Sequence, residues 1–202
     1  TSTTQYTLTV TDANGCTNTA QASVNVNPVP NASAGLNQSI CFGESTTLFA
    51  IGGDTYVWSP GNVNAASLNV SPAATTDYTV IAANLFGCLD TAQVQVRVNP
   101  LPVASFVQSG PVCQSIPVNF TDQSSVGTGS ISSWSWDLGN NVTSTTASPS
   151  LLYTASGNYT VRLIVTTSDG CKDTVDQPVS IYAEPTASFS SIDVCEGLPV
   201  QF

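Results

Sequence analysis

The sequence has no histidine and few charged residues, and these absences exclude several kinds of function. Only 8% of its 202 residues are charged, and three cations face thirteen acids, which gives a net charge of −10. Without histidine, neither a Ser-His-Asp nor a Cys-His catalytic arrangement can form, and histidine cannot hold a metal. The negative charge disfavours phosphate backbones and anionic membrane surfaces. We therefore expect no enzyme activity, no cofactor and no nucleic-acid partner.

Long apolar runs, helical stripes and CxxC pairs are also missing. No stretch approaches the roughly 20 apolar residues of a membrane span, so we expect no membrane insertion. The chain has no initiator methionine and no signal peptide, which predicts that it is part of a longer protein. Its six cysteines fit neither a zinc site nor a thioredoxin-type motif. Disulfides in an oxidising compartment remain, and they predict a secreted protein, extracellular or on the cell surface.

What the sequence does contain is a repeat in two families of segments. The first family has three members, QYTLTVTDANGCTNTAQASVNVNPVP from Gln5, DYTVIAANLFGCLDTAQVQVRVNPLP from Asp77 and NYTVRLIVTTSDGCKDTVDQPVSIYAEP from Asn158. The second has SICFGESTTLFA from Ser39, PVCQSIPVNFTD from Pro111 and DVCEGLPVQF from Asp193. Cys16 and Cys88 lie 72 residues apart, and so do Cys41 and Cys113. The two families keep step, which indicates an array of modules.

Prolines at 28–30, 100–102 and 185 mark the joints of this array, because proline cannot continue a strand ladder and favours extended linkers. We predict four segments. They are the last strands of a truncated module at 1–28, a complete module at 29–100, a second at 101–184, and the first strands of a further module at 185–202.

Each module reads as antiparallel β-structure. Tyr159, Val161 and Leu163 alternate with polar residues, and the segment 93–98 alternates in the same way. Short strands at regular spacing, separated by glycine-containing turns, predict an all-β chain of tandem Ig-like β-sandwiches arranged end to end.

Two parts of the chain resemble known families. SWSWDLGNN at 133–141, followed by SPSLLYTASGNYTVRLIVTTSDGC, resembles the PKD domain, whose signature is approximately WDFGDG, NPxHxY and GxYxVxLxVxxxxG. Leu138 replaces the phenylalanine of that signature and Asn140 replaces its second aspartate. Asp137 is therefore the acidic residue of the signature that remains. The segment 29–100 looks like the Ig-like repeats of large Bacteroidota surface proteins. The resemblance implies the fold strongly and the function weakly, because such modules serve as spacers, adhesin stalks and accessory domains of secreted hydrolases.

The aromatic residues are expected to be core residues. Trp58 and Trp136 occupy the strand on which Ig-like sandwiches bury a large aromatic, and Tyr78 and Tyr159 occupy the position of a tyrosine corner. Trp134, at the strand's edge, stays open as a surface for stacking on sugar rings.

Metal and glycan sites are weaker expectations. Asp122, Asp137 and Asp169 lie near predicted loops, but they lack the dense spacing of a dedicated calcium site, so calcium is the less favoured alternative to turn capping. Asp90-Thr91-Ala92 and Asp173-Thr174-Val175 match the O-glycosylation signal of secreted Bacteroidota proteins. The resemblance therefore predicts glycans on Thr91 and Thr174, against the ordinary interpretation of a threonine that opens a strand.

For the cysteines, two pairings are open. The intramodule scheme joins Cys41 to Cys88 and Cys113 to Cys171. In an Ig-like sandwich, however, the first turn and the last hairpin lie at opposite ends, about 20 Å apart, whereas a disulfide needs Cα atoms about 4.4–6.8 Å apart. The favoured prediction is therefore an intermodule disulfide between Cys41 and Cys171, with the other four cysteines pairing to neighbouring modules.

Taken together, these features predict a stalk or filament shaft of a long secreted bacterial surface protein, stiffened by disulfides between modules. Its partners would be neighbouring modules of the same chain, and other copies of the chain or surface glycans are further candidates. The alternative is a set of glycan- or protein-binding modules accessory to an adhesin or a polysaccharide hydrolase.

Overall fold

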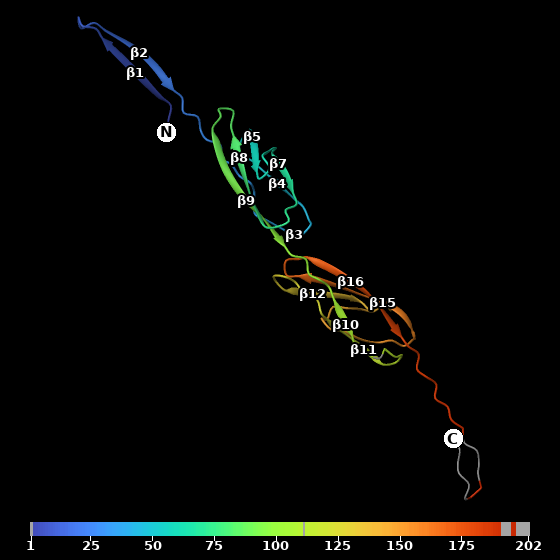
Figure 1. The fold of residues 1–202 in the computed structure, drawn as a ribbon. Coiled ribbons are helices and arrows are strands. Elements are labelled where there is room, and N and C mark those ends of the chain that lie inside the picture. Colours follow the sequence, from blue (N-terminus) through green and yellow to red (C-terminus); the bar gives the residue numbers. More distant parts are fainter. Residues whose placement is uncertain (1, 111, 191–194, 197–202) are drawn as a thin grey trace. The chain divides into compact units, whose positions relative to one another are not determined.

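The protein is built from strands, as the sequence predicts. The computed structural model describes residues 2–110, 112–190, 195 and 196, and all regular elements among them are β-strands (Figure 1). The chain forms two compact units, Thr1–Asn99 and Pro100–Phe202. The described part of the chain contains no helix with the length and apolar character that a bilayer crossing requires. The all-β fold class is thus confirmed, while the finer module limits stay predictions.

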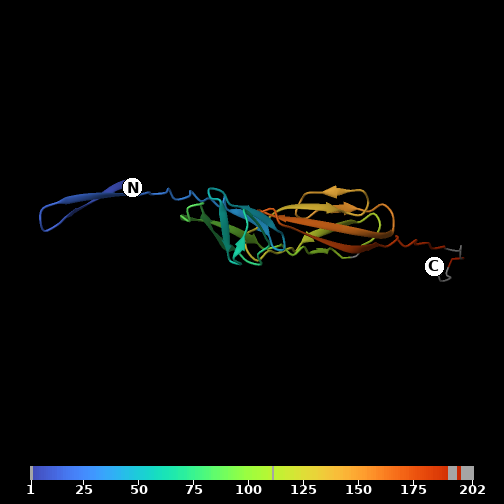
Figure 2. The same ribbon diagram turned by 90° about the horizontal axis from the view of Figure 1, so that it is seen from above.

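The first unit begins with a hairpin of β1 (Thr4–Thr11) and β2 (Thr17–Val24), a two-stranded ribbon in both views (Figures 1 and 2). Its pairing is repeated later in the chain. Tyr6 lies opposite Ala22 in this hairpin, and Tyr78 lies opposite Val94 in the next one, each 72 residues further on. The sequence repeat is therefore also a repeat of strand register.

The rest of the first unit, which we call the β3–β9 sandwich, has two sheets. One has the strand order β3-β9-β8-β5-β6 and the other pairs β4 with β7. The strands are β3 (Gln38–Cys41), β4 (Thr46–Phe49), β5 (Thr55–Ser59), β6 (Val63–Asn64), β7 (Ser67–Val70), β8 (Thr76–Ala83) and β9 (Leu89–Asn99). Side chains of both sheets form one buried cluster around Trp58, Leu48 and Val80, so the sheets pack face to face.

One strand pair of the β3–β9 sandwich is parallel, whereas its other strand pairs are antiparallel, as the sequence predicts. β3 runs parallel to β9, with Gln38 opposite Val96 and Cys41 opposite Asn99. The first regular strand of the sandwich therefore lies beside the end of its last strand.

The second unit contains the β10–β16 sandwich. Its sheets have the orders β10-β11-β14 and β13-β12-β15-β16. The strands are β10 (Phe106–Gln108), β11 (Pro117–Asp122), β12 (Ile131–Asp137), β13 (Thr143–Ser144), β14 (Ser150–Leu152), β15 (Gly157–Thr167) and β16 (Lys172–Ile181). The predicted start of a further module at 185–202 lies largely outside the described residues.

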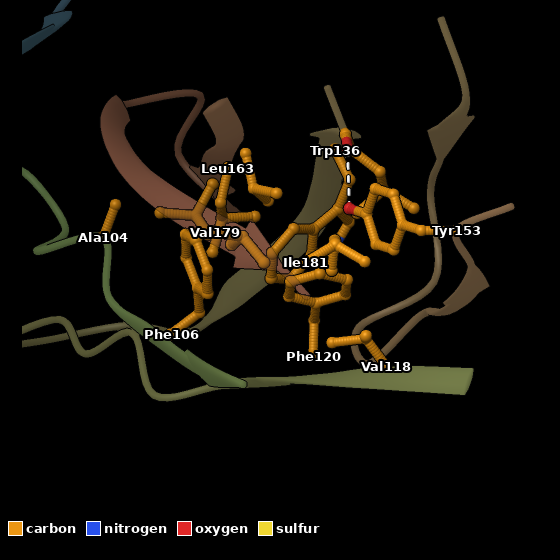
Figure 3. Close-up of a cluster of buried hydrophobic side chains, with 12 residues drawn as sticks. Ala104, Phe106, Val118, Phe120, Trp136, Tyr153, Leu163, Val179 and Ile181 are labelled. Carbon is orange, nitrogen blue, oxygen red and sulfur yellow. Dashed lines mark hydrogen bonds between the residues drawn. The ribbon is translucent and has the colours of Figure 1, made fainter. Parts of the chain in front are cut away.

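The core of the β10–β16 sandwich lies between its sheets (Figure 3). Phe106, Val118 and Phe120 of one sheet point toward the other sheet, from which Leu163, Val179 and Ile181 meet them. The ring of Trp136 lies edge-on to Phe106, with 5.1 Å between centroids. Burying such large side chains is the main source of stability for a fold of this size.

Candidate functional site

The hairpin cysteine follows a turn that is built in the same way three times. In each turn, a side-chain oxygen four residues before the cysteine accepts a hydrogen bond from the cysteine's backbone N–H. The three pairs are Asp12 with Cys16 at 2.9 Å, Asn84 with Cys88 at 2.9 Å, and Thr167 with Cys171 at 3.1 Å. The glycine just before each cysteine has a left-handed backbone, with φ of 83°, 79° and 89°. The local sequence therefore fixes where the cysteine stands on its hairpin.

The other cysteine family lies in a second kind of turn. The Cys41 carbonyl accepts the N–H of Glu44, and the Cys113 carbonyl accepts the N–H of Ile116. Two residues after each cysteine the backbone is left-handed, with φ of 88° at Gly43 and 62° at Ser115. The same turn is thus formed with glycine in one sandwich and serine in the other.

Each of these turns lies next to the last strand of its own sandwich. Cys41 is opposite Asn99, the final residue of β9, and Phe42 donates its N–H to the Asn99 carbonyl at 2.9 Å. Cys113 forms an isolated parallel bridge with Tyr182, just after β16. The first-turn cysteine therefore marks the end of the sandwich at which the chain leaves.

The cysteines differ in their chemical state. Cys41 and Cys171 are disulfide-bonded. Cys16, Cys88, Cys113 and Cys195 are free thiols. The two intramodule pairings would each need one of these thiols, Cys88 in the first case and Cys113 in the second.

The predicted core aromatics lie mostly inside the sandwiches. Trp58 and Trp136 are buried, and Tyr78 is 7% exposed. Tyr159 is half-buried, and its hydroxyl donates to the Ala155 carbonyl at 3.0 Å, four residues upstream as in a tyrosine corner.

Trp134, left open as a sugar-stacking residue, is half-buried and packs against the core. Its indole N–H donates to Asp122 Oδ2 at 2.7 Å. The same carboxylate accepts the N–H of Ser124 at 3.0 Å. Asp122 therefore acts here as a hydrogen-bond partner of neighbouring groups.

The remaining acids do not gather into a metal site in the described part of the chain. Asp137 caps a turn by accepting the N–H of Gly139 at 2.9 Å. No three acid, cysteine or histidine side chains among the described residues lie together so that they could hold an ion.

The two Asp-Thr tripeptides make long-range contacts that the sequence motifs did not reveal. Thr91 and Thr174 are exposed on β9 and β16. Asp90 accepts the N–H of Ala32 at 2.8 Å, and Asp173 accepts the N–H of Ala104, also at 2.8 Å. The signal available in the sequence was the shared spacing, since each aspartate comes two residues after a hairpin cysteine and each alanine two residues after a proline.

The fold and its signature residues can be compared with known proteins. Residues 99–181 match the PKD domain family. The chain is 36% identical over 98 residues to the pre-pro-metalloprotease PrtV of Vibrio cholerae, an alignment that covers 48% of this chain and 10% of that protein. The chain thus spans about a tenth of the length of the curated relative it matches.

Two solved structures of PKD1 domains are similar to part of the chain. The PKD1 domain of Vibrio anguillarum Epp is 31% identical, with a TM-score of 0.40, covering 43% of this chain and 99% of that domain. The PKD1 domain of Vibrio cholerae PrtV is 38% identical, with a TM-score of 0.38. The match covers 41% of this chain and 98% of that domain. These relatives come from Vibrio, so the resemblance to Bacteroidota surface proteins stays a prediction.

Proposed function

We propose that this chain is a structural segment, a stalk or filament shaft, of a long secreted bacterial surface protein, stiffened by disulfides between modules. The observation that carries the proposal is the state of the cysteines. Cys41 and Cys171 are disulfide-bonded, whereas Cys88 and Cys113, which hold the equivalent positions in the repeat, are free thiols. Disulfides of this kind persist in oxidising, extracellular compartments.

The proposed connectivity joins Cys41 to Cys171, across the linker between the sandwiches. Cys41 is paired in register with Asn99, the last residue before the linker. Cys171 belongs to the same hairpin as Asp173. The Asp173 carboxylate accepts a hydrogen bond from the backbone N–H of Ala104, just after the linker. Five residues from Asn99 to Ala104 reach at most about 18 Å, so the linker and the Asp173–Ala104 contact together limit how far apart the two cysteines can lie.

The same rule accounts for the free thiols. A first-turn cysteine pairs with the hairpin cysteine of the following module, so Cys113 would pair with a hairpin beyond residue 202. Cys88 would pair with a first-turn cysteine of the module that contains β1 and β2. Each such disulfide restrains a proline linker. Without the disulfide, the linker would be extended, but the angle between the two modules could vary.

The test is a non-reducing peptide map of the chain, with hinge flexibility followed by small-angle X-ray scattering. We expect one cross-linked peptide pair that contains Cys41 and Cys171, and a broader distribution of shapes after reduction. A Cys41–Cys88 cross-link would overturn the proposal. So would an unchanged scattering profile in a Cys41→Ser variant.

The second candidate is a binding module accessory to a secreted adhesin or hydrolase. The match to a protein named as a metalloprotease favours it. The test is binding of the chain to a glycan array. Binding that disappears in Trp134→Ala and survives in Tyr56→Ala would support this function, whereas no binding above background would count against it.

A further inference from the structure

We infer that Asp173 and Asp90 are positioning residues that fix the incoming linker to the cysteine hairpin, and that they thereby promote disulfide formation at the joint. This inference rests on the proposed function. It starts from the two matching contacts, Asp173 with Ala104 and Asp90 with Ala32, each at 2.8 Å. The partners lie 69 and 58 residues apart in the chain, so neither contact is a local turn.

The two contacts occupy equivalent places in the two sandwiches. Asp173 lies near the start of β16, and Asp90 lies near the start of β9, each on the strand that follows the hairpin cysteine. Ala104 and Ala32 lie just after the proline joints. The same contact therefore occurs in both sandwiches of this chain. It does so although the number of residues between the aspartate and its alanine differs, 69 in one case and 58 in the other.

The segment that follows each proline joint, 31–34 in the first sandwich and 103–105 in the second, is here called the leading segment, and its backbone pairs with the opposite sheet. Val103 exchanges backbone hydrogen bonds with Ser125, which follows β11 in the sheet that lacks the cysteine hairpin. In the first unit, Ser33 exchanges such bonds with Ile51, which follows β4. Successive N–H groups of an extended chain point to opposite sides, so the N–H of the neighbouring alanine faces away from that sheet.

The aspartate takes up this outward-facing donor. Ala104 is buried, so an unpaired N–H at this position would be costly. Asp173 satisfies it with a carboxylate, the stronger kind of acceptor. The bond attaches the leading segment to the sheet that carries Cys171. Cys171 lies only two residues before Asp173 in the sequence.

This tie acts on the joint because it shortens the free path between the two cysteines. With Asp173 in place, the end of the linker at Ala104 is bonded directly to the strand that follows Cys171. Without it, the nearest attachments of this segment are the backbone pair of Val103 with Ser125 in the other sheet and the hydrogen bond from Gln177 of β16 to the Phe106 carbonyl, which lies further along both segments. A shorter tether raises the effective concentration of one thiol near the other. Asp90 would do the same for Cys88 and its partner in the module that contains β1 and β2.

The reaction that reports this effect is thiol–disulfide exchange with glutathione. The thiols of Cys41 and Cys171 form one S–S bond, the S–S bond of oxidised glutathione breaks, and two molecules of reduced glutathione carry away the two hydrogens. The equilibrium constant of this exchange is the effective concentration of the two cysteines.

The experiment uses the whole chain with Cys16, Cys88, Cys113 and Cys195 replaced by serine. The variants are Asp173→Ala, Asp173→Asn and Asp90→Ala, each equilibrated in glutathione buffers at a temperature where both sandwiches remain folded. We expect Asp173→Ala to lower the effective concentration by roughly three- to tenfold. We expect Asp173→Asn to stay close to the parent, because its amide oxygen can still accept the N–H of Ala104.

Asp90→Ala is the matched control, since it removes the same kind of bond from a joint that does not contain Cys41 and Cys171. We expect it to lower the melting temperature of its own sandwich and to leave the effective concentration unchanged. An equal drop in Asp90→Ala and Asp173→Ala, or no drop in either, would overturn the inference. Failure of the parent chain to form the Cys41–Cys171 disulfide would instead overturn the proposed function.

Discussion

The indole N–H of Trp136 donates a hydrogen bond to the carbonyl oxygen of Thr146 at 2.9 Å. Trp58 makes the same kind of contact with the carbonyl of Ala65 at 3.0 Å in the other sandwich. Each tryptophan therefore fills a core and also fixes a loop ten or seven residues further along the chain. Both roles contribute to the stability of the sandwich, and they can be separated by substitution.

Trp136→Phe keeps an aromatic ring in the core but removes the donor to Thr146. We expect the free energy of unfolding of the β10–β16 sandwich to fall by about 1–3 kcal/mol, because the hydrogen bond to Thr146 is lost and the smaller ring leaves core volume unfilled. Chemical denaturation followed by circular dichroism measures the change. Trp58→Phe is the matched variant, and it should lower the stability of the β3–β9 sandwich instead. A loss of less than 0.5 kcal/mol, roughly the lower limit for a hydrogen bond, would show that the Thr146 contact contributes little.

The left-handed turn at Ser115 gives a second prediction, since Gly43 has the same conformation in the other sandwich. A residue with a Cβ is strained in this region by roughly 1–2 kcal/mol, and the extra freedom of glycine in the unfolded chain offsets part of that. We expect Ser115→Gly to stabilise its sandwich by about 0.5–1 kcal/mol. Thermal unfolding followed by calorimetry would detect the shift.

The reverse substitution, Gly43→Ser, provides the control and should destabilise the β3–β9 sandwich. If both variants destabilise, the Ser115 hydroxyl makes a contribution that outweighs the strain, and the prediction is wrong.

The raised pKa of Tyr153 predicts how the stability of the β10–β16 sandwich changes at alkaline pH. Burial, and to a lesser degree the nearby Tyr159 and Asp137, raise the pKa of Tyr153 from 10.0 to about 12. Its hydroxyl donates to the Leu138 carbonyl at 2.7 Å (Figure 3). The unfolded chain releases this proton at lower pH than the folded chain does. The stabilising contribution is therefore complete below pH 10 and is lost as the pH rises toward 12.

Urea denaturation at a series of pH values from 9 to about 12 would measure this loss. Tyr153→Phe should flatten the dependence of the β10–β16 sandwich on pH in this range. Burial also raises the pKa of Tyr78, so the β3–β9 sandwich should lose stability in the same direction. A Tyr153→Phe variant with the same alkaline slope as the parent would contradict the assignment.

Thr91 and Thr174 stay predicted O-glycosylation sites. Both threonines are exposed, which a modifying enzyme requires, and both follow an aspartate. We expect peptides of the protein purified from its native host to carry hexose-containing additions at these positions. Tandem mass spectrometry with electron-transfer fragmentation would locate them. A serine or threonine outside the Asp-Thr pattern, such as the exposed Thr121, should remain unmodified in the same sample. Complete recovery of both target peptides without an added mass would rule the sites out.

Much of the fold could be predicted because its signals are local. The alternation around Tyr159 and Val161 marks a strand, and the glycine before Cys171 marks its turn, and both depend on a few adjacent residues. Repetition strengthened these signals, since the same turn occurs at Cys16 and Cys88.

The contacts that the sequence did not predict are long-range. The parallel pairing of Cys41 with Asn99 and the bond from Asp173 to Ala104 join residues far apart in the chain, and short polar residues such as aspartate fit many surface positions equally well. The Asp-Thr tripeptides consequently suggested a glycan signal, while the carboxylates proved to hold the leading segments. Trp134 was left open for a related reason, because its donor bond to Asp122 depends on two strands that meet only in the folded sandwich.

The parallel pairing of β3 with β9 determines how the β3–β9 sandwich responds to mechanical load. Pulling on its two ends draws the start of β3 and the end of β9 in opposite directions along their common axis. All four residue pairs, from Gln38–Val96 to Cys41–Asn99, are then sheared together instead of being unzipped one at a time. In the β10–β16 sandwich, the only parallel contact found at this place among the described residues is the single bridge from Cys113 to Tyr182. Under tension, the segment around Cys113 should therefore detach from the end of its last strand at a lower force than β3 detaches from β9.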